Sequence, residues 1–130
     1  MNAAHAYART RNETASKERL MVLLFEKALA HMRAGAVALD EGRPTEAIGV
    51  LGKATDIVTE LSATLDVNAV PELGAQLKEL YLFVSTRLLK AMTARDSSAA
   101  REAERVFAPI ADAFGQAVAA MMGAAAGDTR

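Results

Sequence analysis

The stretch from Pro44 to Leu65 decides the fold, and it reads PTEAIGVLGKATDIVTELSATL. Its apolar residues recur at intervals of three and four positions, which places them on one face of a helix. They are Ala47, Val50, Leu51, Ala54, Val58, Leu61 and Leu65. Pro44 suits the first turn of a helix, where its missing N–H is not needed. The stretch therefore predicts an amphipathic helix that buries one stripe.

The same helical spacing continues on both sides of this segment. From Pro71 onward the stripe consists of Leu73, Leu77, Leu80, Val84, Leu88 and Ala91. A further stripe consists of Ala103, Val106, Phe107, Ile110, Phe114, Ala117 and Met121. Ahead of Pro44, the run from Leu20 to Phe25 covers nearly the whole circumference of a helix. The breaks near 42–44, 66–71 and 96–98 are short, which favours antiparallel neighbours.

These features predict an all-α chain that folds as an antiparallel up-down four-helix bundle. We expect helices over 17–40, 44–65, 71–94 and 98–122, so that the bundle spans 16–122. The polar segment 1–15 is expected to be flexible, and 123–130 to form a disordered tail. Pro109 should kink the last helix, because a proline inside a helix removes one hydrogen bond.

Composition limits the classes of function. The chain has 130 residues, with 15 basic and 16 acidic side chains and no cysteine, which suits one domain without disulfides or thiolate chemistry. A net charge of −1 argues against nucleic acid or an anionic membrane as the main partner. The longest uncharged run, 113–127, is shorter than the roughly 20 residues of a membrane span. We therefore expect a soluble, cytoplasmic protein without membrane insertion.

The two histidines match no metal-binding or nucleophile pattern. Neither His5 nor His31 follows a glutamate at the spacing of di-iron bundles or zinc proteases. We therefore predict no metal, no cofactor and no enzymatic activity. One alternative rests on His31 and Gly35, whose spacing resembles that of four-helix histidine phosphotransfer domains. In those domains the glycine opens a path to the imidazole, but their usual lysine is replaced here by Ala34.

Two glycines lie within the helix predicted over 44–65. The sequence around Gly49 and Gly52 fails as a phosphate-binding loop, because Ala54 stands where Ser or Thr must hold magnesium. We expect these glycines instead to let another backbone approach closely.

Apolar residues exceed what one buried stripe needs. Met21 to Phe25 are consecutive, and Tyr81, Leu82 and Phe83 lie beside the stripe of the third helix. Two interpretations stay open at this point. The surplus forms a thick core with scattered exposed residues, or it forms a groove for an apolar partner segment.

An ordered set of motifs resembles the flagellar export chaperone FliS family. The set begins with Ala6-Tyr7 and Thr14-Ala15-Ser16, and continues through Leu24 to Leu29. The resemblance is strongest at Lys53-Ala-Thr-Asp-Ile-Val-Thr-Glu-Leu61 and Leu65-Asp66, and it resumes at Leu80-Tyr81 and Arg87-Leu88. It covers about residues 6–92. Lys17 stands where the family usually has proline, and Glu26-Lys27 stands where it usually has Asp-Gly.

This resemblance implies a chaperone that binds the disordered C-terminal segment of flagellin and prevents its premature polymerisation. The chaperone would then help deliver flagellin to the export gate protein of the flagellar type III apparatus. The resemblance implies no cofactor, and we expect a monomer or weak homodimer. An alternative partner is another amphipathic segment, bound by a helical regulator.

The resemblance also suggests which residues bind a partner. For each apolar member, the alternative is a place in the core. Tyr7 is expected to contact the cargo, the export gate or the protein's own groove, and Ile57 is better placed than Val58 to face the surface. The candidates are Tyr7, Leu20, Leu24, Lys53, Asp56, Ile57, Glu60, Leu61, Leu77, Tyr81 and Val84.

Overall fold

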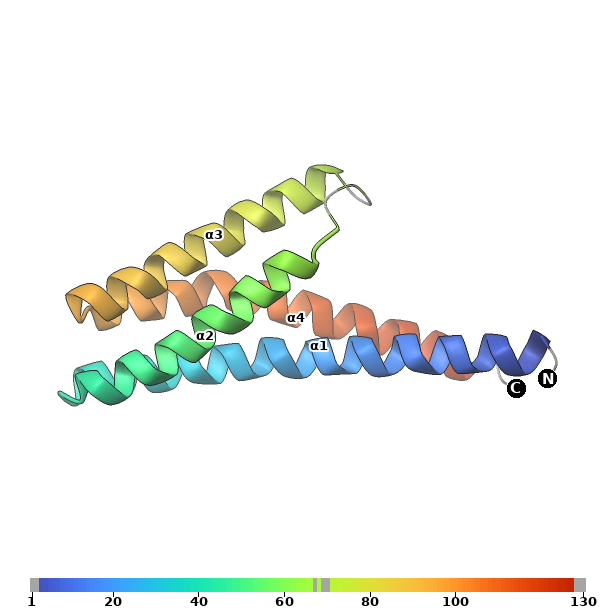
Figure 1. The fold of residues 1–130 in the computed structure, drawn as a ribbon, viewed down its shortest axis with the longest axis horizontal. Helices are drawn as coiled ribbons and strands as arrows, with labels where there is room; N and C mark the ends of the chain where they lie inside the picture. The colour runs from blue at the N-terminus through green and yellow to red at the C-terminus, as the bar shows by residue number, and fades with distance from the viewer. Residues whose placement is uncertain (1–2, 67, 69–70, 128–130) are drawn as a thin grey trace.

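Four α-helices make up the part of the chain that the structure describes. They are α1 (Ala3–Asp40), α2 (Pro44–Thr64), α3 (Pro71–Ala94) and α4 (Ser97–Gly127) (Figure 1). The structure is a computed structural model that describes the backbone of residues 3–66, 68 and 71–127, and the side chains of these except 7–8, 10–12, 14–15 and 125–127. The prediction of an all-α fold is confirmed.

Tight turns reverse the chain after α1 and after α3. At the end of α1, Gly42 has a φ of +71°, and the N–H of Arg43 donates to the carbonyl of Ala38 at 2.8 Å. At the end of α3, Arg95 takes the same left-handed conformation with a φ of +52°, and the N–H of Asp96 donates to the carbonyl of Ala91. Both are helix-terminating turns of the type that usually contains glycine.

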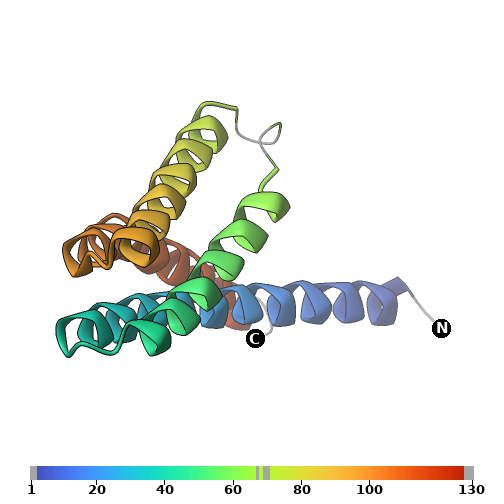
Figure 2. The same ribbon diagram turned by 60° about the vertical axis from the view of Figure 1, so that its left-hand side comes forward.

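The helices pack in neighbouring pairs around one core. α1 packs against α2 and α4, while α3 packs against α4 and α2. Helices that follow one another run in opposite directions (Figure 1). α2 and α3 diverge from α1 and α4 as they approach the connection between them, so the molecule is open at that end (Figure 2).

The core is apolar, and every helix contributes to it. Its largest fully buried side chains are Phe107, Met32, Leu51, Leu88, Val58 and Val84. Three aromatic pairs join α1, α3 and α4, with ring centroids 5.4 Å apart for Phe25 and Phe107, 5.0 Å for Phe25 and Phe114, and 6.3 Å for Tyr81 and Phe107. Among the described side chains, no polar or charged residue belongs to the buried class.

One glycine brings α1 and α2 close together, and it is not one of the expected pair. A Cβ atom built on Gly35 would lie 2.3 Å from Cδ2 of Leu51, whereas nothing lies within 4 Å of such an atom on Gly49 or Gly52. The prediction for Gly49 and Gly52 is therefore wrong, because both lie away from the neighbouring helices. Gly35 instead makes room for a fully buried leucine.

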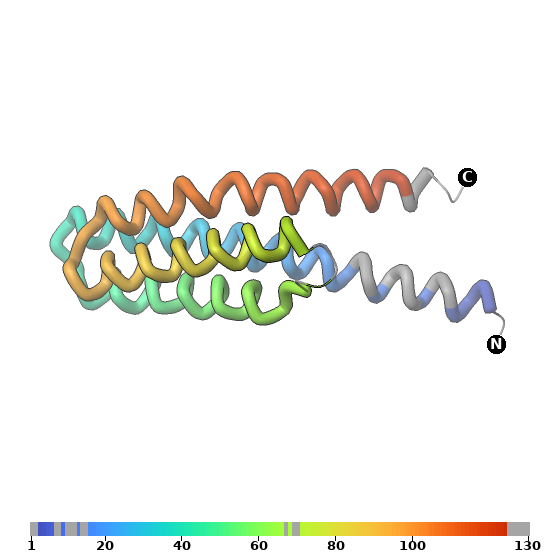
Figure 3. The backbone as a smooth tube through the Cα atoms, turned by 90° about the horizontal axis from the view of Figure 1, so that it is seen from above, coloured from blue at the N-terminus to red at the C-terminus, as the bar shows by residue number. Residues whose placement is uncertain are grey.

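The ends of the helical region differ from the expected boundaries. α1 begins at Ala3 rather than near residue 17, so most of the segment predicted to be flexible is helical in backbone. The segment before residue 17 is rich in alanine, which favours helix, and it contains no proline or glycine. α4 continues through Pro109 and as far as Gly127, beyond the predicted end at residue 122. The N-terminal end of α1 projects past the other helices (Figure 3).

Candidate functional site

α3 carries the largest set of exposed apolar side chains on one described helix. We call this set the α3 apolar surface, and it consists of Leu73, Leu80, Leu82, Phe83 and Leu89. Leu82 is 66% exposed and Phe83 is 38% exposed. Residues 82 and 83 are about 100° apart around a helix, so Leu82 and Phe83 lie at different edges of this surface. It lies beside the buried stripe that contains Tyr81, Val84 and Leu88.

One edge of the α3 apolar surface faces α4. Arg87 is one turn beyond Phe83, and its guanidinium carbon lies 5.6 Å from the centroid of the Phe83 ring. The Nη1 of Arg87 lies 3.4 Å from Oε2 of Glu102 on α4. Phe83 therefore lies at the boundary between α3 and α4, next to Arg87, whose guanidinium already interacts with Glu102.

The other edge borders a groove between α2 and α3. The groove has a volume of about 310 Å³ and contains small side chains, which keep it open. Leu82 lines it, and so does Tyr81, although Tyr81 is only 5% exposed. Burial raises the pKa of Tyr81, so its hydroxyl stays protonated at neutral pH. The lining residues are Thr59, Ser62, Ala63, Lys78, Tyr81, Leu82 and Ser85.

A second groove runs between α1 and α4. One part, of about 580 Å³, lies between Val22, Glu26 and Leu29 of α1 and a face of α4 that includes Ala111, Gly115 and Ala119. An adjoining part, of about 380 Å³, reaches Arg19 and Met122. There the Nε of Arg19 donates to the sulfur of Met122 at 3.1 Å. The α1–α4 groove is therefore lined by small and apolar residues with a few charges.

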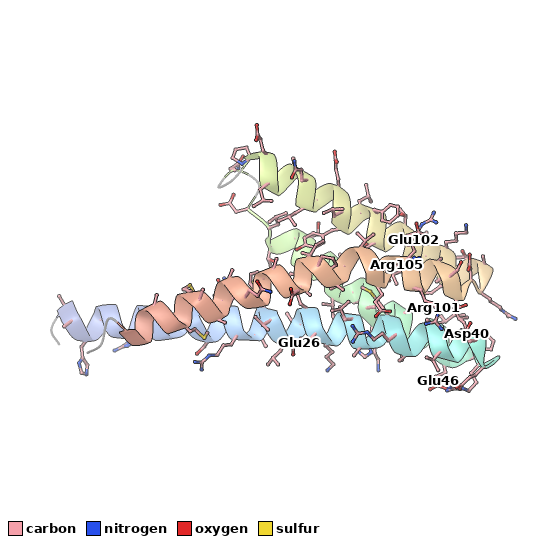
Figure 4. The ribbon with its side chains drawn as sticks, turned by 180° about the vertical axis from the view of Figure 1, so that it is seen from behind. Glu26, Asp40, Glu46, Arg101, Glu102 and Arg105 are labelled. Atoms are coloured by element: carbon pink, nitrogen blue, oxygen red, sulfur yellow. The ribbon has the colours of Figure 1, made fainter. Side chains whose placement is uncertain are left out.

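Ion pairs join α1 and α4 at this groove and beyond it. Arg33 pairs with Glu104, and Arg101 pairs with Asp40 near the end of α1. Figure 4 shows Arg101 next to Asp40. Hydrogen bonds from Ser97 and Arg101 hold the pKa of Asp40 below its usual value. Because these groups are exposed, the pairs fix the register of the helices more than they stabilise the fold.

α4 contributes Ala103, Phe107 and Val118, among others, to the buried core and exposes Met121. Among the described helices it is the one long and apolar enough to cross a membrane, over Ser97–Ala124, a feature that core helices of soluble proteins share. We did not expect such a segment from the sequence. Of the most apolar window of this helix 11% is buried, and Val106, Ile110 and Phe114 are partly buried against the core.

The seam between α1 and α2 contains a group of cations around His31. His31 is partly buried, while Lys27 and Lys53 are exposed. Burial lowers the pKa of His31, and the positive charges of Lys53 and Lys27 lower it further. The imidazole is therefore neutral at pH 7.

The predicted partner-binding residues fall into three groups. Leu20, Lys53, Asp56 and Glu60 are exposed, and Leu24, Ile57 and Leu77 are partly buried. Leu61, Tyr81 and Val84 are buried in the core stripes of α2 and α3, which is the alternative given above for the apolar members. Ile57 is more exposed than Val58, as predicted. The side chain of Tyr7 lies outside the described residues.

The sequence interpretation missed most of the α3 apolar surface. Leu80 was expected in the core stripe, yet it is exposed, and Leu82 and Phe83 were noted only as surplus. Leu89 had no assignment. The sequence did contain a signal for Leu82, Phe83 and Leu89. Large apolar residues one position away from a complete core stripe must face a helix boundary or solvent.

The His31–Gly35 arrangement does not have the geometry of a phosphotransfer site. Gly35 faces Leu51, so the space above the glycine is filled by α2. Two lysines lie on the same side as the imidazole. Among the described side chains, no group of three or more His, Cys, Asp or Glu residues could hold a metal ion.

Comparison with known proteins identifies the family of the chain. Residues 1–121 match the family model of flagellar protein FliS. The chain is 32% identical over 116 residues to the flagellar secretion chaperone FliS of Salmonella typhimurium strain LT2, covering 85% of this chain and 86% of that protein. It is 34% identical over 103 residues to the flagellar secretion chaperone FliS of Escherichia coli strain K12, covering 78% of this chain and 75% of that protein.

The family decides between the broad classes that the sequence left open. FliS is a family of chaperones and not of enzymes, which confirms the prediction that the chain is not an enzyme. The chain belongs to the FliS family of flagellar secretion chaperones.

Proposed function

We propose that this chain binds the disordered C-terminal region of flagellin in the cytoplasm. Binding would prevent premature polymerisation and help to deliver flagellin to the export gate protein of the flagellar type III apparatus. We further propose that the antiparallel up-down four-helix bundle is the form that receives the cargo, as a monomer or weak homodimer. Family membership supports the chaperone role.

The observation that carries this proposal is the α3 apolar surface. Five large apolar residues on one described helix are exposed, on both sides of a complete core stripe. Exposed apolar surface of this kind is usually covered by a partner. A disordered segment gains most from such a surface when it folds as amphipathic helices along it.

The grooves beside this surface extend the proposed binding area. The α2–α3 groove borders Leu82, and the α1–α4 groove is lined on α4 by small residues such as Gly115 and Ala119. Small side chains at both grooves permit close approach of a helix. We propose that the cargo occupies the α3 apolar surface first, and that Leu20 and Leu24 extend the contact on α1.

Tyr7 and the polar members of the predicted set have separate proposed roles. Lys53, Asp56 and Glu60 are exposed on α2, where they would orient the cargo rather than provide most of the affinity. We propose that Tyr7 contacts the cargo or the export gate.

Substitution of Leu82 and Phe83 tests the proposal. Leu82→Ser and Phe83→Ser remove apolar contact area at sites that are already solvent-exposed in the free protein. Each should weaken binding of a labelled flagellin C-terminal segment about tenfold, as expected for losing one buried apolar side chain. Fluorescence anisotropy measures the dissociation constant, and thermal melting should show little loss of stability.

Val37→Ser is the matched control, because Val37 is 42% exposed on a different helix. It should bind flagellin like the unmodified chain. If the two α3 variants also bind like the unmodified chain, the cargo does not use this surface.

A further inference from the structure

Two lysines flank a partly buried histidine at the α1–α2 seam. Lys27 and His31 are four residues apart on α1, so their side chains lie on the same face one turn apart. Lys53 on α2 is close enough to affect His31 electrostatically. The contact of Gly35 with Leu51 fixes the register of the two helices, and it brings Lys53 opposite this turn of α1.

No carboxylate neutralises this group in the free chain. Among the described residues, every ion pair with a side-chain carboxylate uses an arginine, and none uses Lys27 or Lys53. The electrostatic influences on His31 come from cations alone.

Other charged groups also lie near this part of α1. Asp56 and Glu60 lie one and two turns after Lys53 on the same face of α2, and neither pairs with Lys27 or Lys53 among the described ion pairs. On the α4 side, Arg33 is engaged with Glu104. Among the described ion pairs, Lys27 and Lys53 therefore have no carboxylate partner.

Apolar side chains border the cations on the same seam. Leu24 and Ile57 are both partly buried, one on each helix. A ligand here would place a negative group among the cations and apolar atoms beside it. A nucleic acid or a free anion would not use the apolar flank, whereas an amphipathic protein segment would use both.

We propose that Lys27, His31 and Lys53 bind a carboxylate of the flagellin segment, which anchors the cargo at the α1–α2 seam. This inference rests on the proposed function, and it names the chemistry of one contact. An arriving carboxylate offsets the repulsion from the two lysines and favours protonation of His31.

Two measurements on the full chain test this anchor. Histidine NMR spectra, recorded against pH with and without the flagellin C-terminal segment, follow His31, whose signal is assigned by its loss in His31→Gln. Binding should raise the pKa of His31. Calorimetry at pH 6 in two buffers of different ionisation enthalpy should detect proton uptake, and His31→Gln should abolish it.

Charge variants test the lysines. Lys53→Gln should weaken binding about three- to tenfold at low salt, with a smaller effect at high salt. Lys90→Gln, which neutralises an exposed lysine on α3, is the control and should leave the affinity unchanged. An amidated segment identifies the carboxylate, because weaker binding of the amide points to the chain terminus and equal binding points to an acidic side chain.

The outcomes separate this inference from the proposed function. If the segment binds but the His31 pKa is unchanged and Lys53→Gln binds normally, the anchor is wrong and the chaperone role stands. If no segment binds under any condition, both proposals fall.

Discussion

At the scale of single residues, Gly35 shows how little space separates α1 from α2. Its position would place a Cβ atom 2.3 Å from Cδ2 of Leu51, which is itself fully buried. A methyl group therefore forces Leu51 or the helices to move. Such overpacking usually costs more than the helix propensity that alanine adds.

Gly35→Ala should lower the free energy of unfolding by about 1–3 kcal/mol, because the new methyl group overlaps with Leu51. Gly49→Ala is the matched control, since nothing lies within 4 Å of its Cβ position. That variant should gain up to about 1 kcal/mol from helix propensity. Urea denaturation measures both, and equal stabilisation by the two substitutions would contradict the close packing at Gly35.

At the scale of elements, Asp96 starts α4. Its Oδ1 accepts hydrogen bonds from the N–H of Ser98 at 2.9 Å, from the Ser98 hydroxyl at 2.6 Å and from the N–H of Ala99 at 3.3 Å. These bonds satisfy backbone donors that the first turn of a helix leaves free. They also hold the pKa of Asp96 below its usual value, with the Ser98 hydroxyl as the largest cause.

Asp96→Ala should lower the free energy of unfolding at pH 7, as expected for the loss of an N-cap. The lowered pKa adds a pH dependence, because the ionised cap is favoured in the folded state. The difference between the variant and the unmodified chain should therefore shrink as the pH falls through the native pKa, below 3.8. Denaturation at pH 7 and pH 3 measures this.

Asp96→Asn keeps an oxygen acceptor at the same place and should restore most of the stability at pH 7. A loss as large as that of Asp96→Ala would mean that charge, rather than capping, is the main contribution of this side chain.

The sequence predicted the elements well where apolar spacing and breaking residues agree. α2 and α3 begin at Pro44 and Pro71 as expected, because proline is favoured in the first turn. The predicted start of α1 was wrong because the segment before residue 17 is rich in alanine, which favours helix, and contains no proline or glycine.

The candidate site was harder to predict than the helices. Leu61 and Val84 belong to buried stripes, while Leu82 and Phe83 lie beside them. Spacing gives the angle between side chains on one helix, but exposure depends on where the neighbouring helices stop. α2 and α3 diverge from α1 and α4, and that divergence has no local signal in the sequence.

At the scale of the whole molecule, the four helices expose large apolar side chains in addition to those that form the core. α3 exposes five large apolar residues. The α1–α4 and α2–α3 grooves add concave surface. In our account this surface is the template on which the flagellin segment folds.

Titration calorimetry of the full chain against the flagellin C-terminal segment, at two or more temperatures, tests this account most directly. We predict a one-to-one complex with a large negative heat-capacity change, because apolar surface is buried and the cargo folds as it binds. The absence of binding heat at every temperature, together with no co-elution on gel filtration, would contradict the central claim.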